Sequence, residues 1–294
     1  MAKTARSTAR QRAEQARIAR ERAARRARRV RNAWWAIAVA PAFVALLLII
    51  KVAIPSPGGG LGSGELSAAT VAALSPPADV LDLVSRGQGV TFPNKTQNQP
   101  ALTAGDKPEV LYIGGEFCPF CAAQRWGLVI ALNRFGSFSG LTGTFSSSKD
   151  AFPNTATLSF HGATYTSDFL VFNGVETSDR DQKQLETLTP DQQQLFTTYD
   201  SPPYVDAQST GSVPFVDFGN QFLQTGTAVD PGLLAGLSHD QVAAKITSDP
   251  TGQVAEAILG AANAFTAIIC KLTNGQPGNV CTSQAATAYQ QEVG

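Results

Sequence analysis

The chain has 294 residues, of which 43% are hydrophobic and 16% are charged, proportions that fit a globular protein and exclude a disordered or fibrous one. Its net charge of zero hides an asymmetry. Residues 1–31 contain twelve Lys or Arg and two Glu, whereas the remainder contains eleven Lys or Arg and twenty-one Asp or Glu. The two parts are therefore expected to lie in different surroundings.

An uncharged apolar segment follows the basic residues. It runs from Ala33 to Ile50, and as a helix it would reach about 27 to 30 Å, enough to cross a bilayer. We predict a basic cytoplasmic tail at 1–32 and a single transmembrane anchor at 33–54, because basic flanks stay inside. The alternative, a cleaved signal peptide, normally has a shorter apolar region and a small-residue cleavage site. The tail is expected to touch membrane lipid rather than nucleic acid.

A flexible linker is predicted at 55–64, where Gly58-Gly59-Gly60 occurs, followed by an extracytoplasmic domain at 65–294. Helices are expected at 68–74 and 76–85, and a polar loop at 92–106.

The next segments predict an α/β domain. A strand at 110–113, a helix from 118 to about 135 and a strand at 141–145 would form a β-α-β unit with parallel strands. Further strands are expected at 156–160 and 167–175, a helix at 189–199, a hairpin around Gly219-Asn220, and helices at 238–248 and 253–272. A β-α-β half, an insertion and a β-hairpin-α half are the order of a thioredoxin-like fold.

The motif Cys118-Pro119-Phe120-Cys121 lies between the first strand of this unit and its helix. A helix start stabilises a thiolate, so this position suits a dithiol/disulfide redox site. Cys118, facing the exposed helix amides, is the expected nucleophile, and Cys121, one turn further in, the resolving thiol. The chemistry passes through a mixed disulfide and requires no metal or organic cofactor.

The Cys-x-x-Cys spacing is also compatible with a zinc site or a structural disulfide. Cys-x-x-Cys is half of many zinc sites, but the remaining ligands are only Cys270, Cys281 and two isolated histidines, without zinc-site spacing. A purely structural disulfide is disfavoured because such a short loop restrains little chain entropy.

The other two cysteines, Cys270 and Cys281, flank a turn-rich loop after the last predicted helix. In an exported domain we expect them to form a structural disulfide, with a second redox pair that relays electrons as the alternative.

Residues around the motif are candidates for supporting roles. Pro119 and Phe120 are expected to border the substrate, and Phe120 adds no charge that would shift the pKa of Cys118. Glu116 is a candidate for proton transfer to Cys121, although a solvated loop carboxylate is the favoured interpretation because charged residues are mostly exposed.

The segment from Lys107 to Gly136, which contains the motif, resembles an uncharacterised family of archaeal and actinobacterial proteins with a membrane-anchored thioredoxin-like domain. Ser146-Ser147-Ser148, Pro153-Asn154-Thr155 and the segment from Ile269 to Cys281 fit the same pattern. More distantly, the motif and Val213-Pro214 are similar to the active site of DsbA-type oxidoreductases, with Phe120 where a histidine is usual. That resemblance implies a cis Pro214 beside the sulfurs, and a Val213 whose backbone edge binds substrate.

Together these observations predict an extracytoplasmic thiol-disulfide oxidoreductase that acts on cysteines of exported proteins and exchanges electrons with a membrane or extracytoplasmic redox partner. The alternative is a redox-inert, membrane-anchored interaction module with structural disulfides.

Overall fold

The computed structural model describes residues 64–294. The predicted basic tail, the predicted anchor and all but the last residue of the predicted linker therefore lie outside the described residues.

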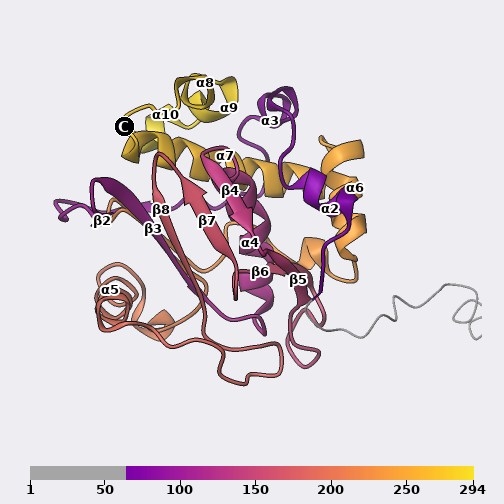
Figure 1. The fold of residues 1–294 in the computed structure, drawn as a ribbon, viewed down its shortest axis with the longest axis horizontal. Coiled ribbons are helices and arrows are strands. Elements are labelled where there is room, and N and C mark those ends of the chain that lie inside the picture. Colours follow the sequence, from indigo (N-terminus) through magenta and orange to yellow (C-terminus); the bar gives the residue numbers. More distant parts are fainter. Residues whose placement is uncertain (1–63) are drawn as a thin grey trace, which may run out of the picture. The chain divides into compact units, whose positions relative to one another are not determined.

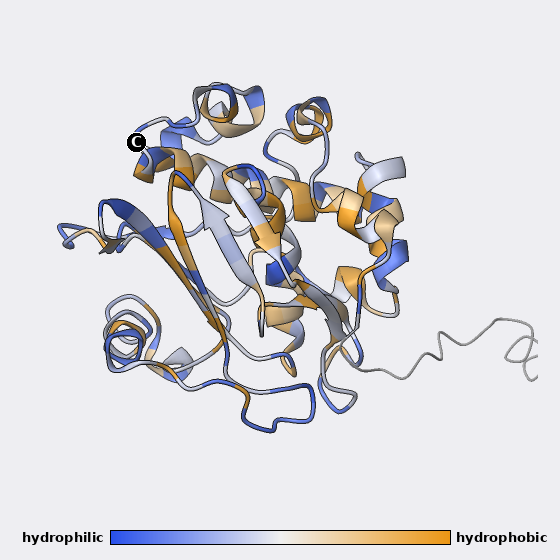
Figure 2. Ribbon diagram, viewed as in Figure 1, coloured by the Kyte–Doolittle hydropathy of each residue, from blue (hydrophilic) through white to orange (hydrophobic). Residues whose placement is uncertain are grey.

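A six-stranded mixed sheet forms the centre of the described domain (Figure 1). Its strands are β1 (Asn94–Lys95), β2 (Thr103–Ala104), β3 (Lys107–Gly114), β8 (Val171–Glu176), β9 (Phe215–Phe218) and β10 (Phe222–Thr225). Strand β3 pairs in parallel with β8, where Val110 lies opposite Phe172, and antiparallel with β9, where Val110 lies opposite Phe218. β3 is hydrophilic at its start and hydrophobic at its buried end (Figure 2), as expected for a strand covered on both faces.

The predicted hairpin is confirmed. β9 and β10 pair antiparallel around Gly219 and Asn220, which have positive φ angles of 65° and 57°. Two such residues in sequence suit a type I′ turn, whose twist matches that of the strands.

Four shorter strands form two antiparallel pairs outside this sheet. They are β4 (Gly136–Ser139) with β7 (Thr164–Ser167), and β5 (Thr142–Phe145) with β6 (Ala156–Ser159).

The helices of the described residues occur close to the predicted positions, apart from three short helices near the C-terminus that the sequence did not indicate. They are α2 (Ala68–Ala73), α3 (Ala78–Val84), α4 (Pro119–Leu132), α5 (Pro190–Tyr199), α6 (His239–Ser248), α7 (Gln253–Leu272), α8 (Gly278–Cys281), α9 (Gln284–Thr287) and α10 (Gln290–Val293). Helices α5 and α6 begin with capping boxes, at Thr189 and Ser238.

Alternate residues of β3 and β9 divide the core between the two faces of the sheet. Val110 and Tyr112 join the large cluster that contains α4 and α7, whereas Leu111 and Ile113 join a smaller cluster that contains residues of α5. Helices α4 and α7 pack closely at Gly127, where an added Cβ would lie 3.1 Å from the Cβ of Ala261.

The predicted parallel partner of β3 was wrong. Residues 141–145 were expected to enter the main sheet, but β5 pairs with β6, and the chain returns to β3 only at β8. β8 lies at the edge of the main sheet, where β3 is its one partner among the described strands. Phe172 and Val175 of β8 nevertheless bury their side chains in the core clusters on the two faces of the sheet, whereas β5 contains Thr142, Gly143 and Thr144.

The predicted loop at 92–106 also differs in detail, because its ends contribute the short edge strands β1 and β2.

Helix α7 is long and apolar enough to span a membrane by length and composition, the one such helix among residues 64–294. Within the protein, 83% of its apolar window is buried, so it is the core helix of the domain. It does not bear on the predicted anchor at 33–54, which lies outside the described residues.

Candidate functional site

Cys118 lies at the junction where β3 turns into α4. It is the N-cap residue of α4, with extended backbone angles, and its Sγ accepts a hydrogen bond from the backbone N–H of Cys121 at 3.3 Å. Pro119 follows at the first helical position, where its missing N–H costs no helical hydrogen bond. The sulfur therefore occupies the place that a Ser or Asp oxygen takes at most helix starts.

The two thiols are free and differ strongly in acidity. A side-chain hydrogen bond from Cys121 and the nearby backbone amides lower the pKa of Cys118 to about 7, against the opposing effect of burial. Burial, and next the proximity of Cys118, raises the pKa of Cys121 well above its ordinary value. At neutral pH Cys118 is thus partly a thiolate, while Cys121 keeps its proton.

The segment before β9 completes the immediate surroundings of Cys118. The Val213–Pro214 peptide bond is cis, as the resemblance implied, and the Cys118 Sγ lies 3.6 Å from the carbonyl oxygen of Val213. Pro214 is buried and Val213 is half-buried. The structure therefore brings Val213-Pro214 next to the Cys118–Cys121 motif, as the sequence analysis expected.

Access to the site is uneven. Cys118 is 6% exposed and Cys121 is fully buried, whereas Phe120 is 41% exposed and packs its ring edge against Phe152. Pro119, predicted to border the substrate, is buried and shapes the helix start instead. Phe120 is thus the apolar residue of the motif that remains open to a partner.

The favoured interpretation of Glu116 as a solvated carboxylate was wrong. Its side chain is 4% exposed, and its two oxygens accept hydrogen bonds from the hydroxyls of Ser159 at 2.5 Å and Thr144 at 3.3 Å. Strands β5 and β6, which form a separate pair outside the main sheet, supply these two hydroxyls. A buried, hydrogen-bonded carboxylate two residues before Cys118 remains a candidate for proton transfer.

A fully buried ion pair beneath the motif was not predicted. Arg125 of α4 forms two hydrogen bonds with Glu176 at the end of β8, Nε to Oε1 at 2.7 Å and Nη2 to Oε2 at 2.6 Å, and neither side chain is exposed. Burial, the largest single effect, lowers the pKa of Arg125, but Glu176, Tyr112 and Cys121 together outweigh it and the pKa is raised. The Arg125 charge also contributes to the lowered pKa of Cys118.

A sequence signal for Arg125 existed. It lies seven residues after Cys118 and four after Cys121, which places all three on one face of α4. No comparable spacing identifies Glu176, because β8 reaches this position only through its pairing with β3.

Tyr112 completes the buried surroundings of Cys121. Burial raises the pKa of Tyr112 well above its usual value, and Cys121 adds to this rise while Arg125 opposes it. Among residues 64–294 its hydroxyl has no partner in ordinary hydrogen-bond geometry.

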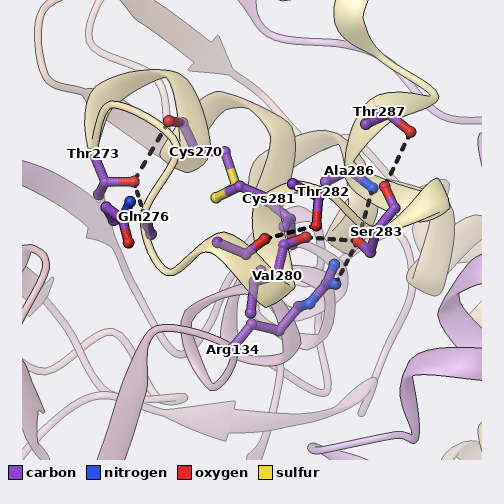
Figure 3. Close-up of a disulfide and its surroundings, with 12 residues drawn as sticks. Arg134, Cys270, Thr273, Gln276, Val280, Cys281, Thr282, Ser283, Ala286 and Thr287 are labelled. Carbon is purple, nitrogen blue, oxygen red and sulfur yellow. Dashed lines mark hydrogen bonds between the residues drawn. A yellow bond between two sulfur atoms is a disulfide. The ribbon is translucent and has the colours of Figure 1, made fainter.

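Cys270 and Cys281 form a disulfide that joins the end of α7 to α8 (Figure 3). Next to it, Arg134, just after the end of α4, donates a hydrogen bond to Ser283 at 3.0 Å. Cys118 caps the other end of this 14-residue helix, about 20 Å away. The disulfide and the motif are therefore separate features.

Among residues 64–294, no group of three His, Cys, Asp or Glu side chains is placed to hold a metal ion. His239, isolated in the sequence, instead donates a hydrogen bond from Nε2 to the carbonyl of Thr157 and packs against Phe145 and Trp126.

Comparison with known proteins adds a family. Residues 93–271 match a domain of unknown function, DUF929. The chain belongs to this family. The DUF929 region includes the Cys118–Cys121 motif, the Arg125–Glu176 pair and Val213-Pro214, and it ends before Cys281. No curated protein and no solved structure matches the sequence.

Proposed function

We propose that this DUF929 protein is a thiol-disulfide oxidoreductase whose redox centre is Cys118 and Cys121. The observation that carries the proposal is the position of Cys118 as the N-cap of α4, where its sulfur accepts the Cys121 amide and its pKa falls to about 7. A low-pKa nucleophile with a buried thiol three residues on is the arrangement that disulfide exchange uses.

In the reductive direction, the Cys118 thiolate attacks one sulfur of a substrate disulfide. A bond forms between that sulfur and Cys118, the substrate S–S bond breaks, and the departing sulfur takes the electron pair and a proton. Cys121, once deprotonated, attacks Cys118 and releases the second substrate thiol. Two electrons have then moved to the substrate, and Cys118 and Cys121 are joined. The oxidative direction reverses these steps.

Substrate would approach over Phe120 and Val213. Phe120 offers an exposed ring beside the nucleophile, and the carbonyl of Val213 lies next to the sulfur on a half-buried segment. An extended peptide that pairs with this backbone edge would bring its own cysteine to Cys118.

Two structural observations support a thioredoxin-like domain acting outside the cytoplasm. The parallel β3–β8 pair with α4 between its strands, followed by the β9–β10 hairpin and α7, supports a thioredoxin-like order, with β4 to β7 inserted between α4 and β8 instead of after the β-α-β unit as predicted. The Cys270–Cys281 disulfide fits an oxidising compartment. With the anchor predicted at 33–54, the substrates would be cysteine-containing exported proteins.

The acidity of Cys118 favours a reductant or isomerase over a strong oxidant. A strong oxidant such as DsbA has a nucleophile pKa near 3.5, whereas that of thioredoxin is about 7. The value of about 7 for Cys118 matches the second group.

Trapping tests the proposal. The Cys121→Ala variant of the full chain, in detergent, is mixed with a small disulfide-bonded protein and analysed without reductant. We expect a mixed disulfide through Cys118, because the resolving thiol is gone, and its disappearance on adding dithiothreitol. The matched control is Cys118→Ala, whose buried Cys121 should form no adduct. If neither variant forms an adduct with any disulfide substrate, the protein is the redox-inert interaction module.

A further inference from the structure

A polar hollow lies between two loops that are hydrogen-bonded to the residues just before the motif. It has a volume of about 400 Å³ and is lined by residues of two loops, Ser147, Lys149 and Asp150 from one and Asp181, Gln182 and Lys183 from the other. This volume is within the range of sites that hold small molecules. The loops connect β5 to β6 and β8 to α5, and they project near the start of α4 at the bottom of the view in Figure 1.

Both loops are attached to the residues just before Cys118. The backbone N–H of Ser147 donates to the carbonyl of Phe117 at 2.8 Å, and the N–H of Glu116 donates to the carbonyl of Ser178 at 2.8 Å. Across such a bond two Cα atoms lie about 5.5 Å apart, and neighbouring Cα atoms are about 3.8 Å apart, so Ser147 lies within about 9 Å of Cys118. A molecule of about three residues could span from the hollow to the sulfur.

The walls of the hollow are held in place. Arg180 of the second loop donates hydrogen bonds to the side chain of Asn154 at 2.7 Å and the carbonyl of Ser146 at 3.4 Å, both in the first loop. Within the second loop, the Asp179 carboxylate accepts from the backbone N–H groups of Asp181 and Lys183, each at 2.8 Å. The hollow is thus defined before any ligand arrives, which reduces the entropy lost on binding.

The charges of the hollow are unpaired. Among the residues that the structure describes, Lys149 and Lys183 form no ion pair, and neither does Asp150 or Asp181. Two ammonium groups and two carboxylates in one small hollow complement a ligand that carries charges of both signs.

We infer that this hollow binds a small zwitterionic thiol, a cysteine-containing amino acid or peptide such as glutathione, and places its sulfur at Cys118. The inference rests on the proposed redox function of that cysteine. The lysines receive the carboxylates of the thiol, and the aspartates receive its ammonium group. A compact hollow favours this ligand over a long peptide, for which the Val213 edge is better suited.

The chemistry is a reduction of the Cys118–Cys121 disulfide. The thiolate of the small molecule attacks Cys118, its sulfur bonds to that sulfur, and the electron pair of the broken bond goes to Cys121, which takes a proton from water. A second thiolate attacks the small-molecule sulfur of the mixed disulfide and releases Cys118 as a thiolate. Two small thiols become one disulfide, and the protein gains two electrons.

Reduction kinetics test the inference. The oxidised full chain in detergent is reduced with glutathione or with β-mercaptoethanol, which lacks charged groups, and the appearance of protein thiols is followed. We expect the rate to saturate with glutathione and to rise linearly with β-mercaptoethanol. In the Lys149→Ala/Lys183→Ala variant the glutathione rate should fall about five- to tenfold, with the β-mercaptoethanol rate within twofold of the wild type. Lys245→Ala, an exposed lysine on α6, is the matched control and should change neither rate.

The inference would be overturned if the rate of reduction rose linearly with the glutathione concentration. It would also be overturned if the double variant left the ratio of the glutathione rate to the β-mercaptoethanol rate unchanged. If the double variant slowed only the reduction of the Cys118–Cys121 disulfide by thiol-containing proteins, that result would also overturn the inference and assign the hollow to peptides. If neither thiol opens the Cys118–Cys121 bond in the native protein, the proposed redox function itself fails, which is a different result.

Discussion

The acidity of Cys118 depends on a few named contacts. The largest is the side-chain hydrogen bond from Cys121, followed among the favourable contributions by the backbone N–H of Cys121 and the charge of Arg125, with burial acting in the opposite direction. Phe120 provides only its backbone N–H, since its ring has neither charge nor donor. The acidity of this sulfur is therefore set by Cys121, Arg125 and the backbone of α4 rather than by the side chains of Pro119 and Phe120 between the cysteines.

Substitutions of Cys121 distinguish the effect of its side chain on the pKa of Cys118 from the effect of its backbone N–H. Cys121→Ser keeps a side-chain donor and the backbone N–H, whereas Cys121→Ala keeps only the latter. We expect the alkylation rate of Cys118 by iodoacetamide to show a midpoint near pH 7 in the serine variant and a higher midpoint in the alanine variant. Equal midpoints in the two variants would show that the Cys121 side chain does not stabilise the thiolate.

Helix α4 combines three roles along its length. Its start holds the two sulfurs, its second turn holds Arg125, and Arg134, just after its end, donates a hydrogen bond to Ser283 beside the Cys270–Cys281 disulfide. At the same end, α7 is continued by the short helices α8 to α10, of which α9 is anchored by the N–H of Ala285 donating to Asp82 at 2.8 Å. The disulfide thus fixes the C-terminal segment to the helix that closes the core.

Removing this disulfide should destabilise the domain without affecting the motif. Its cysteines are 11 residues apart, for which the loop-entropy model gives about 3 kcal/mol. In a Cys118→Ala/Cys121→Ala background, Cys270→Ser/Cys281→Ser should lower the free energy of unfolding in urea by about this amount. In the otherwise native chain, the same pair of changes should leave reduction of a substrate disulfide within twofold. A complete loss of activity there would instead identify the pair as an electron relay.

Two buried carboxylates make the stability of the whole domain dependent on pH. Asp217 of β9 has no exposed surface, and one oxygen accepts the N–H of Asn220 at 2.6 Å while the other has no partner among the described residues. Burial raises the pKa of Asp217 to about 7 and that of Asp200 to about 6. Because the ordinary value is near 4, the folded state binds more protons than the unfolded state between about pH 4 and 7. Stability therefore decreases as the pH rises through this interval.

Asp217→Asn should remove most of this dependence, since an amide keeps the acceptor for Asn220 without acquiring a charge. We expect its melting temperature, relative to the wild type, to be roughly 5 °C or more higher at pH 8 than at pH 5. The exposed carboxylate of Asp206 supplies the control, Asp206→Asn. Parallel pH curves for wild type and Asp217→Asn would contradict the assignment.

Much of the fold could be predicted because local signals agreed with it. The positive-φ turn at Gly219-Asn220, the caps at Thr189 and Ser238 and the apolar length of α7 each act within a few residues. The parallel partner of β3 could not be predicted, because the choice between residues 141–145 and β8 depends on which of the two strands is buried in the core of the folded domain. A short parallel strand and a short antiparallel edge look alike in sequence.

The same division holds at the candidate site. Cys118, Cys121 and Val213-Pro214 could be identified because they form motifs, and Arg125 was within reach because helical spacing aligns it with both cysteines. Glu116 was misplaced and Glu176 overlooked because a buried carboxylate is recognised by its partners. Those partners, Ser159 and Arg125, lie 43 and 51 residues away along the chain.

The close contact at Gly127 links the packing of the core helices to the position of Cys118 and Cys121. Gly127 lies nine residues along α4 from Cys118, and its lack of a side chain lets α4 rest directly on Ala261 of α7. A side chain added at Gly127 would press against Ala261 and push α4 away from α7. Cys118 and Cys121, at the start of the same helix, would move with it. A change in the packing of either helix would therefore alter the surroundings of Cys118 and Cys121 from a distance, leaving every residue that touches a sulfur as it was.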